Sequence, residues 1–357
     1  MQDTNPLGLE FETTDSNEVE MLVKVEIENF IYRSLGPDIV DKMMTKEEFS
    51  TRMSFQYSIL LDLISKSDFE SFKEYVCSYE FYVKSWTSKR IKEHFSSKST
   101  IHDLEDKHLK FCIDHINAAI KKAQRENTDS LRTFVVKICT ELGDKLAISQ
   151  DPLDAIMVLN NVDQEQFVHW LNKCVQEMTE SLREKFKNTE FETKLSLLHI
   201  KPENELFNTV IGCGQQCPFC KIPCDAGGEA HTQHFAALHR PQGLGQFSWE
   251  NSNKLSTDIC SCLVISDGYF RCSDTKNEYH PYKRYREIYP DWNIFPDGSL
   301  DASDYWKYVM NKYNEKFAKA NDAKPADIPD SWKKITKEEA VKSLKKSFNI
   351  KSFIAEF

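Results

Sequence analysis

The sequence is poor in glycine and proline, with 11 and 12 of these residues among 357. This scarcity excludes collagen-like and low-complexity chains, and it argues against a fold built mainly from short strands and turns. Long apolar runs are missing as well, since none approaches the roughly 18 uninterrupted residues that a membrane-spanning helix needs. The sequence therefore predicts a globular protein that does not enter a membrane.

Positive charge is in short supply: 46 Lys and Arg residues stand against 56 Asp and Glu residues, which gives a formal net charge of −10. Because this balance repels phosphate backbones, nucleic-acid binding would require a local basic patch. The first residues, MQDTNPLGLEFETTDSNEVE, lack both the basic and the apolar region of a secretory signal peptide. We therefore expect a cytosolic or nuclear protein whose cysteines stay reduced.

Motifs of several enzyme classes are absent from the sequence. It contains no Gly-x4-Gly-Lys-[Ser/Thr] loop that could cradle phosphates, so no nucleotide site is predicted. It contains no His-Glu-x-x-His, and no His-x-Glu precedes the Pro-Cys-x-x-Cys-like stretch, as the zinc deaminases would require. These absences favour a non-catalytic protein.

Helical periodicity dominates the first half of the chain. At this length two or three domains are expected. Apolar residues recur every three or four positions from about residue 19 to 205, and the breaks between these segments are short and polar, which is typical of an antiparallel helical bundle. Capping boxes are predicted at Thr45 with Glu48 and at Thr336 with Glu339. The apolar stripe of one such segment consists of Phe69, Phe72, Val76, Tyr79, Val83 and Trp86.

The predicted fold is mainly α, a helical bundle followed by a small zinc-stabilised α+β module and C-terminal helices. Residues 1–18 form a flexible lead, and residues 19–205 form the bundle. The texture changes near residue 206, where Gly, Pro, Cys and His become dense, so residues 206–300 are assigned to the Cys/His-rich module. Residues 301–357 are expected to form helices that pack on it.

Seven of the eleven cysteines lie between residues 213 and 272, and four of them fall in the stretch CGQQCPFCKIPC. The set Cys217-x2-Cys220-x13-His234-x4-His239 has the ligand types and the spacing of a tetrahedral zinc site. The pattern leaves the exact ligands open, because Cys213, Cys224 or His231 could each replace one of these four. Four protein ligands would close the site and make the Zn²⁺ structural, so a structural ion is the favoured interpretation.

Other uses of these residues remain as alternatives. Cys260, Cys262, Cys272 and His280 could build a second site. The CPFC stretch also suits a redox pair, but that chemistry requires a preceding strand within an alternating α/β fold, which the helical pattern upstream does not offer. A zinc enzyme with three protein ligands and a water is a third alternative.

The expected partners are proteins, or a second copy of the chain, bound through the helical bundle. The alternative function is a nucleic-acid-binding zinc module that uses residues 280–292, HPYKRYREIYPDW, as its contact surface. There Lys283, Arg284 and Arg286 alternate with aromatic residues that could stack on bases. The same stretch could equally be the edge of an aromatic core with basic side chains reaching into solvent.

Several long stretches carry a family resemblance: GCGQQCPFCKIPCD, HRPQGLG, HPYKRYREIYPDW and SDYWKYVMNKYNEKFAKANDAKPADIPDSWKKIT, with FQYSILLDLI and YEFYVKSW upstream. They resemble the C-terminal region of the interferon-induced very large GTPase family. The resemblance implies a cytosolic and nuclear protein of innate immunity, linked to interferon responses, in which the guanine-nucleotide-binding domain lies far upstream. No residue of this chain inherits GTP binding from it, so the family's enzymatic activity could belong only to a longer parent chain.

Overall fold

The computed structural model describes residues 13–350 apart from residues 97, 127–129, 147–163 and 229. The chain divides into two compact units. The first takes residues up to 41 together with 91–202, and the second takes 42–90 together with 203 onwards. The second unit thus combines an early helical segment with the Cys/His-rich region.

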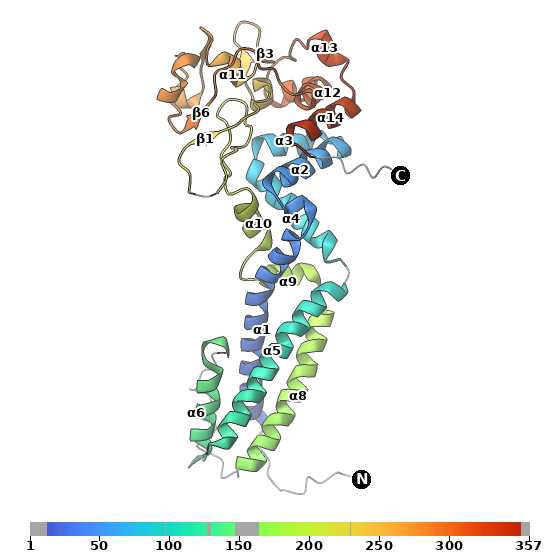
Figure 1. The fold of residues 1–357 in the computed structure, drawn as a ribbon, viewed down its shortest axis with the longest axis vertical. Coiled ribbons are helices and arrows are strands. Elements are labelled where there is room, and N and C mark those ends of the chain that lie inside the picture. Colours follow the sequence, from blue (N-terminus) through green and yellow to red (C-terminus); the bar gives the residue numbers. More distant parts are fainter. Residues whose placement is uncertain (1–12, 97, 127–129, 147–163, 229, 351–357) are drawn as a thin grey trace. The chain divides into compact units, whose positions relative to one another are not determined.

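The first unit is helical in its described part. Helix α5 (Lys98–Arg125) runs alongside α8 (Gln164–Asn188), and α6 (Leu131–Leu142) packs against α5 (Figure 1). Most of α1 (Thr13–Met44) and the short α9 (Phe191–Leu197) complete the unit. A buried ion pair lies within it, since Nζ of Lys194 is 2.8 Å from a carboxylate oxygen of Glu105.

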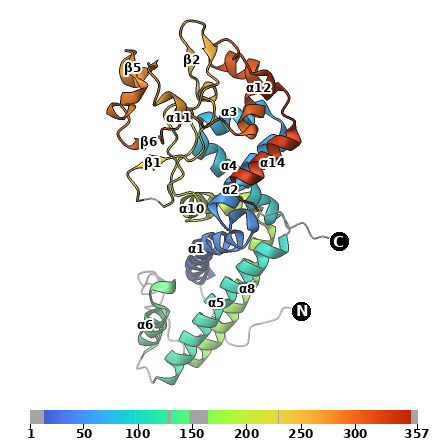
Figure 2. The same ribbon diagram turned by 45° about the horizontal axis from the view of Figure 1, so that its top comes forward.

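In the second unit, helices pack against one side of the Cys/His-rich region (Figure 1). Helix α12 (Asp304–Ala320) packs against α14 (Lys337–Ser347) and α3 (Phe69–Cys77), as Figure 2 also shows. It also contacts the short 3₁₀ helix at Gln242–Gly245. Further α-helices of this unit include α2 (Arg52–Lys66), α4 (Tyr79–His94), α10 (Pro202–Val210), α11 (Cys260–Leu263) and α13 (Asp330–Lys333).

The strands of the second unit are only two residues long. They form three separate pairs: β1 (His234–Phe235) lies parallel to β6 (Trp292–Asn293), and the other two pairs are antiparallel. Those two pairs join β2 (Ser248–Trp249) to β3 (Lys254–Leu255) and β4 (Tyr269–Phe270) to β5 (His280–Pro281). Such short ladders supply little cohesion, so the region depends on side-chain contacts.

Polar side chains set the starts of several helices. The capping box predicted at Thr336 and Glu339 is confirmed at the start of α14. The one predicted at Thr45 and Glu48 is wrong, because Oγ1 of Thr45 donates to the carbonyl of Lys42 at 2.7 Å. Helix α2 is capped instead by Thr51, which accepts a hydrogen bond from the amide of Ser54 at 3.0 Å and stands directly before the first helical residue.

An aromatic core holds the Cys/His-rich region together. Phe219, the third residue of CPFC, is fully buried, and its ring centre lies 4.9 Å from that of Phe270 and 5.2 Å from that of Tyr282. Edge-to-face and tilted pairs of this kind stabilise beyond the area that they bury. The predicted stripe of Phe69, Phe72, Val76, Tyr79, Val83 and Trp86 is buried too, although Ser78 divides it between α3 and α4.

The predicted fold class is confirmed: the chain is mainly α, with a helical region, a small Cys/His-rich α+β module and C-terminal helices. The predicted domain boundaries stay a prediction, and the two compact units divide the chain differently because residues 42–90 join the C-terminal part. Residues 1–12 of the predicted lead lie outside the described residues, and α1 begins at Thr13. In the described part of the chain, every helix is too short or too polar to span a membrane.

Candidate metal centre

Residues 213–224 form a narrow hairpin, here called the knuckle. The amide of Cys217 donates to the carbonyl of Ile222 at 2.8 Å, and the amide of Cys224 donates to that of Gln215 at 2.8 Å. Lys221 turns the chain at the tip with φ of 60°, a left-handed conformation. The hairpin therefore carries Cys217 and Cys220 at its tip.

The tip faces two later segments of the chain, and together they form the inner cluster: Cys217, Cys220, His239 and Cys260. Their ligand atoms all lie within 4.8 Å of one another. Sγ of Cys217 is 3.8 Å from Sγ of Cys260, and Sγ of Cys220 is 3.3 Å from Nδ1 of His239. The three cysteines are fully buried and His239 is 4% exposed.

These separations match a tetrahedral zinc shell. Zinc–sulfur and zinc–nitrogen bonds of about 2.3 and 2.0 Å at tetrahedral angles place two sulfurs about 3.8 Å apart and a sulfur and a nitrogen about 3.5 Å apart. A disulfide would instead require about 2.05 Å between the sulfurs. None of the eleven cysteines, all of which lie in the described part of the chain, forms a disulfide. The inner cluster is thus spaced for an ion rather than for a covalent bridge.

A buried cation lies beside the inner cluster. Arg240 is 0% exposed, and its Nε donates to the carbonyl of Cys220 at 2.6 Å. Burial lowers the pKa of Arg240, while the nearby sulfurs of Cys220 and Cys217 act to raise it. Three thiolates around Zn²⁺ carry a net charge of −1, which a buried guanidinium would balance.

The electrostatics of the tip favour the thiolate at Cys220 but not at Cys217, whose pKa is raised by burial. Burial opposes ionisation of Cys220, but hydrogen bonds from Cys217 and Cys260 and the charge of His239 lower its pKa well below the ordinary value. Burial likewise disfavours charged His239, but the Cys220 sulfur raises its pKa to about 10. A thiolate at Cys220 is therefore favoured before any ion arrives.

The predicted zinc set is divided between two clusters. Cys217, Cys220 and His239 come together, but His234 does not join them. Instead, His234 lies in an outer cluster with Cys213, Cys224 and His231. His234 is kept out of the inner cluster by the pairing of β1 with β6, in which the amide of His234 donates to the carbonyl of Asp291 at 2.7 Å. This pairing directs the His234 side chain away from the tip of the knuckle.

Cys260 takes the fourth place in the inner cluster. Its position at the start of α11, 21 residues beyond His239, follows no paired spacing that sequence reasoning could use. The other candidates for a second site are not gathered around it. Cys262 lies against the carbonyl of Leu300, Cys272 against the hydroxyl of Tyr289, and His280 against the carbonyl of Arg284.

The aromatic-basic segment 280–292 presents few free charges. Nζ of Lys283 lies 2.6 Å from the carboxylate of Asp267, and Nε of Arg284 lies 2.6 Å from that of Glu287. Tyr282 and Tyr285 of this segment are buried. The nucleic-acid interface expected here stays a prediction, and these pairings reduce the positive charge that it would need.

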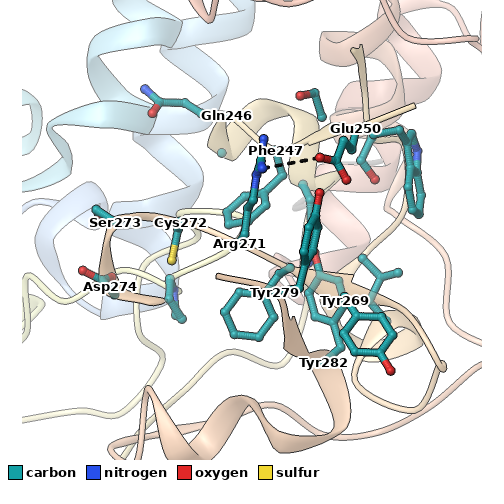
Figure 3. A pocket seen from close by; sticks show the side chains of 18 of the residues that line it. Gln246, Phe247, Glu250, Tyr269, Arg271, Cys272, Ser273, Asp274, Tyr279 and Tyr282 are labelled. Atoms are coloured by element: carbon teal, nitrogen blue, oxygen red, sulfur yellow. Dashed lines mark hydrogen bonds and ion pairs between the residues drawn. The ribbon is translucent and has the colours of Figure 1, made fainter. Parts of the chain in front are cut away.

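A pocket of about 900 Å³ opens beside the aromatic core. Phe247, Tyr269, Tyr279 and Tyr282 contribute to its walls. Figure 3 shows the side chain of Arg271 reaching the carboxylate of Glu250, at 3.4 Å, and its guanidinium carbon lies 5.4 Å from the Tyr279 ring centre.

Comparison with known proteins agrees with the resemblance seen in the sequence. Residues 213–344 match the family described as "Interferon-induced very large GTPase 1, C-terminal domain". The mouse protein named Interferon-induced very large GTPase 1 is 26% identical over 324 residues, which cover 86% of this chain and 13% of that protein. Its human counterpart is 25% identical over 314 residues, covering 83% and 12%.

The chain thus spans about an eighth of the length of these curated relatives. No solved structure matches it. The matched domain contains the knuckle and both clusters. Residues 213–344 therefore match the C-terminal domain of the interferon-induced very large GTPases, and the chain resembles the C-terminal region of such a protein over most of its length.

Proposed function

We propose that this chain is a non-catalytic scaffold and interaction region whose C-terminal domain is stabilised by a structural Zn²⁺ in the inner cluster. The observation that carries the proposal is the set of four buried side chains whose ligand atoms lie within 4.8 Å of one another, with Cys217–Cys260 and Cys220–His239 separations close to tetrahedral values. Four protein ligands complete the coordination of Zn²⁺ and leave no position for a reactive water. Such an ion supplies folding energy rather than catalysis.

The ion would join three segments that local structure holds only weakly. Its ligands come from the tip of the knuckle, from His239 and from the start of α11. Between them lie strands of two residues and loops. Because these elements are too short to be stable alone, a metal crosslink between them contributes much of the cohesion of the domain.

The relation to GTPases is part of the same proposal. The curated relatives carry GTPase in their names, and this chain corresponds to a small part of their length. We assign nucleotide hydrolysis to a longer parent chain and to none of the residues described here. A cytosolic or nuclear location, with a role in interferon responses, follows as the expectation for such a parent, and free thiols suit a reducing compartment.

We assign proteins, or a second copy of the chain, as the partners. The argument is charge: Lys283, Arg284 and Arg271 are each paired with a carboxylate, so this part of the surface offers little attraction for phosphates. Titration with fluorescent single-stranded RNA at low salt is expected to show no tight binding. Tight, steeply salt-dependent binding that is abolished in the Lys283→Ala, Arg284→Ala double variant would overturn this assignment.

Metal analysis of the full chain, purified under reducing conditions without chelators, tests the structural ion. The protein is expected to contain zinc, and Cys220→Ser is expected to lose at least one equivalent and to unfold at a lower temperature. Cys262→Ser is the matched control, since Cys262 lies outside both clusters. A metal-free wild-type protein that unfolds at the same temperature with and without EDTA would refute the proposal.

Cobalt substitution distinguishes a structural site from a catalytic one. The visible spectrum of Co²⁺ in the inner cluster is expected to be that of a closed tetrahedral thiolate site, unchanged by added azide. A five-coordinate spectrum that responds to azide would show an open position and would favour a zinc enzyme instead.

A further inference from the structure

The outer cluster brings together Cys213, Cys224, His231 and His234, whose ligand atoms lie within 4.8 Å of one another. Sγ of Cys213 is 3.7 Å from Nδ1 of His234, and Sγ of Cys224 is 3.5 Å from Nε2 of His231. Both values match the sulfur–nitrogen separation of about 3.5 Å around a tetrahedral zinc ion. The geometry therefore admits an ion here as well.

The histidines of the outer cluster are held in the orientation that a metal requires. Nδ1 of His231 lies 2.8 Å from the carbonyl oxygen of Gly228. Since a carbonyl only accepts hydrogen bonds, the proton lies on Nδ1 and the lone pair of Nε2 is directed at Cys224. His234 turns Nδ1 towards Cys213 while its Nε2 faces the Asp291 carboxylate at 3.8 Å, as metal-bound histidines commonly do.

Backbone amides support the two sulfurs of the outer cluster. The amide of Gln215 donates to Sγ of Cys213 at 3.4 Å, and the amide of Ala226 donates to Sγ of Cys224 at 3.3 Å. Hydrogen bonds to the charged form favour the thiolate, which is the form that ligates zinc. The two amide–sulfur hydrogen bonds and the two oriented imidazoles are independent indications that this cluster binds a metal ion.

From this geometry we propose that the outer cluster is a second Zn²⁺ site. Its ion exchanges with free zinc in solution, while the inner site retains its own ion. Two thiolates neutralise Zn²⁺, and the nearby cation Arg52, which donates to the carbonyl of Cys224, faces the carboxylate of Asp225 at 3.9 Å. Cys213 and Cys224 stand at the two ends of the knuckle, whereas the inner pair stands at its tip. The two sites are therefore interleaved along the chain.

Exposure explains why the outer ion exchanges. His231 is only partly buried and His234 is 11% exposed, whereas the inner cysteines are fully buried. A chelator can reach the outer ion without opening the domain, and its occupancy follows the free zinc concentration. The inner ion is released only when the aromatic core around Phe219 opens. This inference rests on the proposed function in that the inner site holds the knuckle in place.

The test is zinc content and release in the full chain, with His231→Asn as the diagnostic variant. The wild type is expected to hold about two zinc ions per chain and to release them to a chelator in a fast and a slow phase. His231→Asn is expected to lose one equivalent together with the fast phase, and to keep the slow phase. His280→Asn is the matched control, since His280 is a partly buried histidine outside both clusters.

Each outcome separates the two sites. One zinc in the wild type, retained by His231→Asn and lost by Cys220→Ser, would overturn the outer site and leave the proposed function standing. Zinc lost by His231→Asn but not by Cys220→Ser would overturn the proposed function and support the outer site. If His231→Asn misfolds, Cys213→Ser replaces it, and retention of two ions in that variant would overturn the inference.

Discussion

The guanidinium carbon of Arg240 lies 4.8 Å from the centre of the Trp306 ring. One face of this buried cation thus meets an aromatic ring of α12, while its Nε donates to the knuckle at Cys220. Cation–π attraction strengthens when both groups are withdrawn from water. Arg240 therefore couples the C-terminal helices to the inner cluster.

Arg240→Met is expected to destabilise the second unit by about 3 kcal/mol, since it leaves an anionic cluster and buried carbonyls without their cation. Arg240→Lys should recover little, because an ammonium cannot reproduce the planar donor fork. Urea unfolding and zinc retention are the measurements. Arg271→Met is the control: that arginine is exposed and pairs with Glu250, so a change within about 0.5 kcal/mol is expected. Equal effects of the two changes would contradict the role of Arg240.

Gly245 lies where the chain passes the knuckle. A Cβ at this position would collide with the carbonyl oxygen of Phe219 and lie 2.8 Å from Cα of Cys220. Gly245→Ala is expected to lower the free energy of unfolding by about 2–3 kcal/mol, because the backbone of the knuckle must move to admit the Cβ. The same change is expected to lower zinc retention. Gly227→Ala, where a Cβ meets nothing within 4 Å, should leave both unchanged. Thermal unfolding and zinc analysis of both variants check the prediction, which fails if Gly245→Ala behaves like its control.

Phe219 links the metal centre to the aromatic core. Phe219→Ala is expected to lower the free energy of unfolding by about 3–5 kcal/mol, because it removes a fully buried ring. The same change should accelerate zinc release from the inner cluster, since the core that shields it is opened. Phe81→Ala, at a position 66% exposed, is the control for stability and release. Unaltered release kinetics in Phe219→Ala would separate the core from the metal site and contradict the account.

The first unit offers a test that does not involve metal. Lys194 and Glu105 are each 2% exposed and form an ion pair, so Lys194→Met should leave a buried carboxylate and cost about 3–5 kcal/mol. Adding Glu105→Leu should restore most of the stability, because it removes the buried carboxylate, which would keep only His102 as its partner. Zinc content should stay at the wild-type value in both variants. A double variant no more stable than the single one would show that the pair is not the source of the loss.

Sequence periodicity was sufficient to predict the helices, because an amphipathic stripe depends on neighbours three and four residues apart. Periodicity could not predict the division into compact units, because residues 42–90 join the C-terminal part through contacts between distant residues, such as Phe69 with Phe317. Pairings over such distances leave no local periodicity.

The candidate site shows the same limit. The spacing of Cys217 and Cys220 and the nearby His239 identified three members of the inner cluster, because a knuckle is a local structure. His234 was separated from them by the pairing of β1 with β6, which joins segments almost sixty residues apart. Cys260 was brought in by tertiary packing alone. Spacing predicts the kind of site, while the remaining ligands depend on the fold.

X-ray absorption at the zinc edge of the His231→Asn protein tests the central claim most directly, since only the inner ion should remain. The account predicts a first shell of about three sulfurs at about 2.3 Å and one nitrogen at about 2.0 Å. A shell dominated by oxygen, or a sulfur count of two or fewer, would contradict a closed site formed by Cys217, Cys220, His239 and Cys260.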